Sequence, residues 1–188
     1  HTVVLLPYVQ LIPVARAAWL RCAGRHGTVQ ATLVPRFETT QHWAASLGGF
    51  AAQGDDLRQD VAHDILTANA LLRRAGLAES AGALAMRLVE AASSLARMAA
   101  AVPPAVRSAW GVERAAALQA LGNAPVLRTE AALARMALAW AANSAYATDR
   151  LFDARPALLV LLEGLQAEPL HAALRLLLPG RVITLQLD

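Results

Sequence analysis

Lysine is absent from this chain of 188 residues, in which all 17 basic residues are arginine. Its absence excludes from these residues both a phosphate-binding loop with its lysine and an acidic nuclease site that needs one. A single cysteine, Cys22, excludes an internal disulfide and favours a reducing cytosol. Because Cys22 falls within a predicted helix, we expect a small buried hydrophobic residue rather than a nucleophile.

Metal motifs, serine-hydrolase motifs and long apolar runs are also missing. None of the five histidines pairs with another at helical spacing, and no Cys-x-x-Cys occurs, so we expect no metal site. No Gly-x-Ser-x-Gly motif is present. Although 56% of the residues are hydrophobic, no run approaches the roughly 18 residues that span a membrane. We therefore predict no catalytic centre, bound cofactor or membrane contact for these residues.

The first 54 residues alternate between strand and helix patterns. Thr2–Leu6 is an apolar run that Pro7 ends, and a helix with Pro13 in its first turn follows. A second strand is predicted over Thr28–Val34 and a short helix over residues 41–49. This β-α-β-α order favours a parallel sheet.

Residues 55–150 carry only helix patterns. Four helices are predicted, over Asp55–Ala75, Glu79–Ala101, Pro104–Leu121 and Thr129–Ala147. The first has an apolar stripe of Val61, Ile65, Ala68 and Leu72, and the second has one of Leu84, Leu88, Ala91, Leu95 and Met98. We predict an inserted all-helical subdomain whose many alanines allow close helix packing.

The strand pattern returns in Ala157–Leu170, ALLVLLEGLQAEPL. This segment is typical of a buried parallel strand that brings Glu163 to the carboxyl edge of a sheet. A helix over Pro169–Leu178 and a strand over Arg181–Leu187 are predicted next. The chain is therefore expected to be α/β and predominantly helical. Its predicted discontinuous core consists of residues 1–54 and 151–188.

Arginines gather near the first strand, at Arg16, Arg21, Arg25 and Arg36. Trp19 and Trp43 lie among them, where an indole can stack on the bases of a single strand. The alternative is structural, because arginines suit helix ends and tryptophans are usually core residues. We favour the core for both tryptophans and retain a DNA-binding candidate set of Arg16, Arg21, Arg25, Arg36 and Trp43.

Four segments resemble parts of known DNA repair proteins. VVLLPYVQLIPVARAAWLRCAG resembles the segment after the P-loop of superfamily-one helicases. LVPRFETTQHWAASLG resembles the next element of PD-(D/E)XK nuclease family proteins and AddB-type subunits. LLVLLEGLQAEPL resembles their remnant of the helicase Asp-Glu-x-Gln motif, and RVITLQLD resembles the strand that follows it.

The resemblance implies a RecA-like, P-loop NTPase-like sheet with a helical insertion, in the helicase-like domain of an ATP-dependent exodeoxyribonuclease. Glu163 stands at the Walker B aspartate, Gly164 at the catalytic glutamate and Gln166 at the helicase glutamine. Without that glutamate ATP hydrolysis is lost. The implied role is a DNA-binding scaffold for double-strand break repair that docks an AddA-type helicase-nuclease subunit, in the cytoplasm at the nucleoid. Magnesium and ATP would belong to the parent complex.

Two other functions stay open at this point. One is a divergent ATP-binding helicase domain whose P-loop lies upstream of His1. The other is a helical protein-interaction module with only a minor sheet. Because the chain opens on His1 and a strand, we expect it to be a piece of a longer protein. The resemblance implies a nuclease at the far carboxyl end of that protein, beyond this chain.

Overall fold

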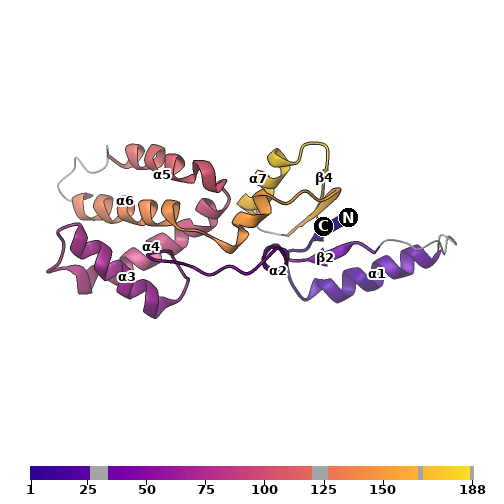
Figure 1. The fold of residues 1–188 in the computed structure, drawn as a ribbon, viewed down its shortest axis with the longest axis horizontal. Coiled ribbons are helices and arrows are strands. Elements are labelled where there is room, and N and C mark those ends of the chain that lie inside the picture. Colours follow the sequence, from indigo (N-terminus) through magenta and orange to yellow (C-terminus); the bar gives the residue numbers. More distant parts are fainter. Residues whose placement is uncertain (26–33, 120–126, 165–166, 187–188) are drawn as a thin grey trace. The chain divides into compact units, whose positions relative to one another are not determined.

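The computed structural model of the chain describes residues 1–25, 34–119, 127–164 and 167–186. It is an α/β structure with a four-stranded parallel sheet, and most of its residues are helical, which confirms the expected fold class. The chain divides into two compact units (Figure 1). The sheet unit consists of His1–Phe50 and Ala147–Asp188, and the helical unit consists of Ala51–Tyr146. The RecA-like classification and the inserted subdomain stay predictions.

The sheet is built from four strands: β1 (Thr2–Leu5), β2 (Arg36–Glu38), β3 (Leu158–Glu163) and β4 (Val182–Gln186). Their order is β2-β1-β3-β4, and all neighbours are parallel. As expected from their apolar runs, strands from both ends of the chain share this sheet, with Leu5 opposite Leu161. Both side chains are fully buried, because central parallel strands are covered on their faces.

Two crossover helices connect the strands. The helix α1 (Leu11–Arg25) leads from β1 to β2, and α7 (Pro169–Leu177) leads from β3 to β4. The two crossovers run in opposite directions across the sheet, so right-handed connections place the helices on opposite faces (Figure 1). On the α7 side, α2 (Thr40–Ser46) packs against the 3₁₀ helix η3 (Ala147–Phe152).

Three expectations for the first 54 residues need comment. The predicted strand Thr28–Val34 falls almost wholly on residues 26–33, which lie outside the described residues. In the described residues the strand β2 lies at Arg36–Glu38, a segment that hydrogen-bonds to β1. Beyond the pairing, the Leu6 amide donates to the Glu38 carbonyl at 2.8 Å. Cys22 is exposed rather than buried, because it lies on the solvent-facing side of α1.

The helical unit contains α3 (Val61–Arg74), α4 (Ala81–Ala100), α5 (Pro104–Gln119) and α6 (Arg128–Asn143). The first of these helices begins at Val61 and not at Asp55, because the Asp60 side chain caps it by accepting from the His63 amide at 3.1 Å. None of the helices in the described parts of the chain combines the length and the apolar character that a membrane span needs.

The buried face of α4 differs from the predicted stripe. Leu88 is buried as expected, whereas Met98 is 52% exposed. Val89 is buried as well, and the remaining buried positions are alanines: Ala81, Ala85, Ala92, Ala96 and Ala99. Leu84, Ala91 and Leu95 of the predicted stripe also pack against the core, so the prediction fails only at Met98. The buried alanines lie beside this stripe, where small side chains let neighbouring helices approach closely.

Candidate functional site

The carboxyl edge of the sheet is where the sequence predicted chemistry, and Glu163 lies there as the last residue of β3. Its Oε1 accepts a hydrogen bond from Nη1 of Arg175 at 2.7 Å, and the same nitrogen lies 3.4 Å from the Thr184 hydroxyl. Arg175 comes from the last turn of α7, and its long side chain reaches the carboxylate of Glu163. The carboxylate therefore has an internal cation as its partner.

Gly164 follows Glu163 and packs against the loop after β1. A Cβ at this position would lie 3.2 Å from the Cβ of Pro7 and 3.8 Å from the hydroxyl of Tyr8. The strand order reverses between β1 and β3, and ligands of open α/β sheets bind outside the carboxyl ends at such a point. In this chain Pro7 and Gly164 meet there, and the Tyr8 side chain is exposed beside them.

His171 of α7 is buried next to this edge and ties α7 to α2. Its Nε2 lies 3.3 Å from the Thr40 hydroxyl, and its Nδ1 has no hydrogen-bond partner among the described residues. Burial is the main cause that holds the pKa of His171 below its usual 6.5; Glu168 and Glu163 oppose that shift, and Arg175 adds to it. The ring is therefore neutral at pH 7 and acts as a structural link.

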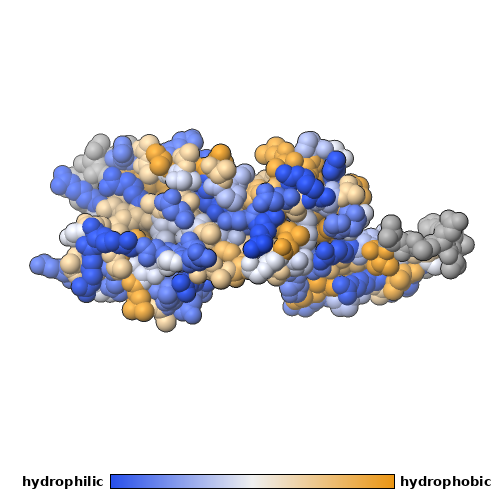
Figure 2. Space-filling view, in the orientation of Figure 1, coloured by the Kyte–Doolittle hydropathy of each residue, from blue (hydrophilic) through white to orange (hydrophobic). Residues whose placement is uncertain are grey.

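Three of the DNA-binding candidates lie on α1. Arg16 and Arg21 are exposed, and Arg25 is the last residue of the helix. Trp19 is 36% exposed three residues after Arg16, against the core position that the sequence favoured. The sequence of α1 contains no acidic residue. Figure 2 shows hydrophilic and hydrophobic residues interspersed over this helix. Arg16 lies one turn from the Trp19 indole, whereas helix geometry puts Arg21 on the opposite side of α1 from it. Exposed arginines together with an exposed indole have the composition of a single-strand binding surface.

The other two candidates are held within the fold. Arg36 donates to Glu38 at 3.2 Å and to the Ser46 hydroxyl at 3.0 Å, so its guanidinium already has partners. Trp43 of α2 is only 1% exposed, which corrects its place in the DNA-binding set, because a buried indole offers no face for stacking. The core position that the sequence favoured for Trp43 is the one it occupies.

The sequence did not predict that Arg175 pairs with Glu163 at the carboxyl edge of the sheet. No spacing rule links Glu163 to Arg175, since the two residues meet only through the β3-α7-β4 crossover. Gln166 lies outside the described residues. Within those described, no group of three or more His, Cys, Asp or Glu side chains gathers in a way that suits a metal ion.

The arrangement can do two things chemically: it neutralises a carboxylate at the sheet edge, and it presents arginines and an indole on α1. Neither feature identifies a family by itself. Comparison of the chain with known protein families, with curated proteins and with solved structures gave no match.

Proposed function

We propose that this chain is a helicase-like domain without ATPase activity, which serves as a DNA-binding and subunit-docking scaffold in a double-strand break repair exonuclease. The observation that carries the proposal is the ion pair of Glu163 with Arg175 beside Gly164. A nucleotide motor needs acidic groups at this edge that hold magnesium and orient water. Here the Arg175 guanidinium pairs with Glu163, Glu38 at the end of β2 pairs with Arg36, and Gly164 offers no carboxylate.

The sheet supports a RecA-like core for this domain. The segments that resemble helicase motifs form β1, β3 and β4, which are adjacent and parallel. Glu163 stands at the carboxyl end of the middle strand of these three. In open parallel sheets this end carries the functional residues, so the position of Glu163 is the one that a Walker B-like acid would take.

The DNA path is assigned to α1. The planar guanidinium groups of Arg16 and Arg21 suit phosphate oxygens, and Trp19 adds a face for stacking. Because acidic residues are absent from the helix, no charge within α1 opposes a phosphate backbone.

DNA binding is tested by fluorescence anisotropy with a labelled single-stranded oligonucleotide over a range of salt concentrations. We expect binding that weakens as the salt concentration rises. The double variant Arg16→Glu with Arg21→Glu removes two phosphate contacts, and each contact contributes about 0.7 to the slope of log K against log salt concentration. The double variant should therefore have a slope smaller in magnitude by about 1.4. Arg114→Glu, an exposed site on α5, is the matched control and should leave binding unchanged. Absence of binding at low salt, or equal binding by the double variant, refutes the DNA path.

Loss of the motor is tested separately, by thermal unfolding with magnesium-ATP. A ligand at 100 times its dissociation constant stabilises a protein by about 2.7 kcal/mol, which is an easily measured shift. We expect no shift. A clear upward shift of the unfolding temperature would favour the divergent ATP-binding domain instead.

Docking is tested by co-expression with an AddA-type subunit and size-exclusion chromatography, in which the two chains should elute together.

A further inference from the structure

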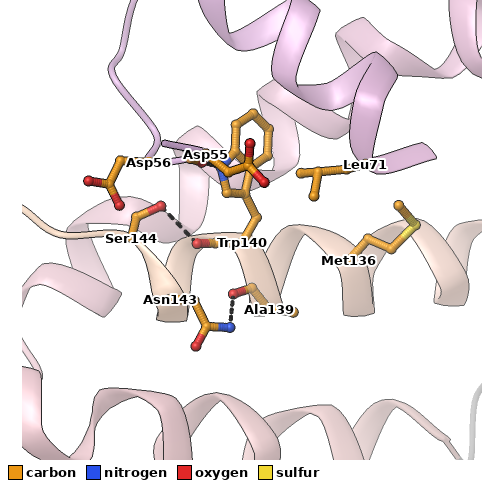
Figure 3. A pocket seen from close by; sticks show the side chains of 8 residues that line it. All are labelled: Asp55, Asp56, Leu71, Met136, Ala139, Trp140, Asn143 and Ser144. Carbon is orange, nitrogen blue, oxygen red and sulfur yellow. Dashed lines mark hydrogen bonds between the residues drawn. The ribbon is translucent and has the colours of Figure 1, made fainter. Parts of the chain in front are cut away.

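A pocket of ≈ 350 Å³ opens between α3 and α6 in the helical unit (Figure 3). Leu71 and Met136 lie beside each other at one end of the view, and Asp55 and the indole of Trp140 line the other end. The lining therefore combines an apolar wall with one acidic end. Asn143 and Ser144 of α6 complete it.

The acidic end of the pocket is anchored to α6 by hydrogen bonds. The Trp140 Nε1 donates to the Asp55 carbonyl at 2.6 Å, and the Leu57 amide donates to the Ser144 hydroxyl at 2.9 Å. The Asp56 carboxylate accepts from two backbone amides, those of Gln53 at 2.9 Å and Ala145 at 3.0 Å. Asp56 therefore holds the segment in place, and the pocket is formed before any ligand arrives.

Asp55 has a different role, because its carboxylate faces outward. It pairs with the guanidinium of Arg74, and both side chains are more than half exposed. A carboxylate can accept about four hydrogen bonds, so this exposed pair leaves capacity for a second cation. The contact with Arg74 also indicates that the position suits a guanidinium.

We propose that this pocket binds an arginine side chain presented by a partner protein. The aliphatic stem would lie along Leu71 and Met136, and the guanidinium would reach Asp55 beside the ring of Trp140. Long basic side chains bury such stems against apolar surface while keeping their charge at a polar group. The carboxylate attracts a cation and forms charge-assisted hydrogen bonds with a guanidinium, which discriminates against neutral side chains.

The proposal is tested by NMR on the whole chain, with its tryptophans ¹⁵N-labelled and the Trp140 resonance assigned from a Trp140→Phe variant. The probe is a Gly/Ser peptide with one central arginine, and its control contains citrulline, the neutral isostere. We expect the arginine peptide to shift the Trp140 indole signal and the citrulline peptide to bind at least about tenfold more weakly, or about 1.4 kcal/mol. Equal binding of the two peptides would overturn the proposal. If propylguanidine binds as tightly as the peptide, the site needs only a guanidinium compound, and the proposal that its ligand is a partner protein is refuted.

Three variants separate this binding from a structural effect. Asp55→Asn should weaken peptide binding about tenfold, and Glu79→Gln, an exposed acid outside the pocket lining, should not. Arg74→Ala removes the guanidinium that competes with the peptide for the Asp55 carboxylate, so it should tighten peptide binding. If Arg74 instead maintains the shape of the pocket, the variant would bind the peptide more weakly. An unaffected Asp55→Asn variant, or weaker binding by Arg74→Ala, contradicts the proposal. The pocket uses neither α1 nor Glu163, so the result is independent of DNA binding.

Discussion

Replacement of Gly111 by alanine measures how closely α5 and α6 pack. A Cβ at Gly111 would lie 2.5 Å from the Cβ of Ala142, whereas non-bonded carbons rest at about 3.5–4.0 Å. Because neither methyl group can rotate away, the helices would have to separate by about 1 Å. Overpacking of this kind costs about 3 kcal/mol, and the gain in helix propensity offsets about 1 kcal/mol. We expect Gly111→Ala to lower the free energy of unfolding by about 2 kcal/mol.

The assay is urea unfolding followed by far-UV circular dichroism, which reads the helices directly. Gly82→Ala in α4 is the matched control, because a Cβ there meets nothing within 4 Å, and it should stabilise the chain by up to about 1 kcal/mol. Adding Ala142→Gly to Gly111→Ala removes the clash and should restore near-wild-type stability. If Gly111→Ala proves as stable as Gly82→Ala, the close approach of α5 to α6 is wrong.

Three further predictions concern the sheet unit. Its free energy of unfolding should be highest above pH 6.5 and should decrease as the pH falls below 6.5. The reason is that the pKa of His171 is lower in the folded chain than in the unfolded chain, so the unfolded chain binds the proton more readily. His171→Gln should flatten this pH dependence in urea unfolding. Trp43→Ala should cost about 3–5 kcal/mol in thermal unfolding, since the indole is buried, and a loss below about 1 kcal/mol would place it outside the core. Cys22 should react with Ellman's reagent in the native protein as fast as in urea, and a thiol silent until unfolding would refute its exposure.

Periodicity predicted the types and approximate positions of most elements. The strand at Leu158–Glu163 and the helix from Pro104 begin where the sequence placed them. On α4 apolar periodicity identified the residues that face the core except Met98, which is exposed, and it gave no weight to the alanines that are buried beside them. It also missed β2, since three residues carry too little pattern and their strand conformation depends on pairing with β1.

The candidate site divides in the same way. Glu163 was identified from the sequence because an apolar run that ends on a carboxylate and a glycine is a local pattern. Arg175 was not, because it lies 12 residues further on and reaches the carboxylate only through α7. The choice between core and surface for Trp19 and Trp43 likewise depended on which side of each helix met another element.

The sequence by itself determined the chemistry available to this protein: arginine as its only cation, an apolar strand that ends on Glu163-Gly164, and helices rich in alanine. These are local properties, set by residue type and by spacing along the chain. The tertiary structure alone decided that Arg175 neutralises Glu163, that Trp43 is buried, and that Asp55 borders a pocket with Trp140. Such contacts join residues distant in the sequence, and only the packing of the elements brings them together.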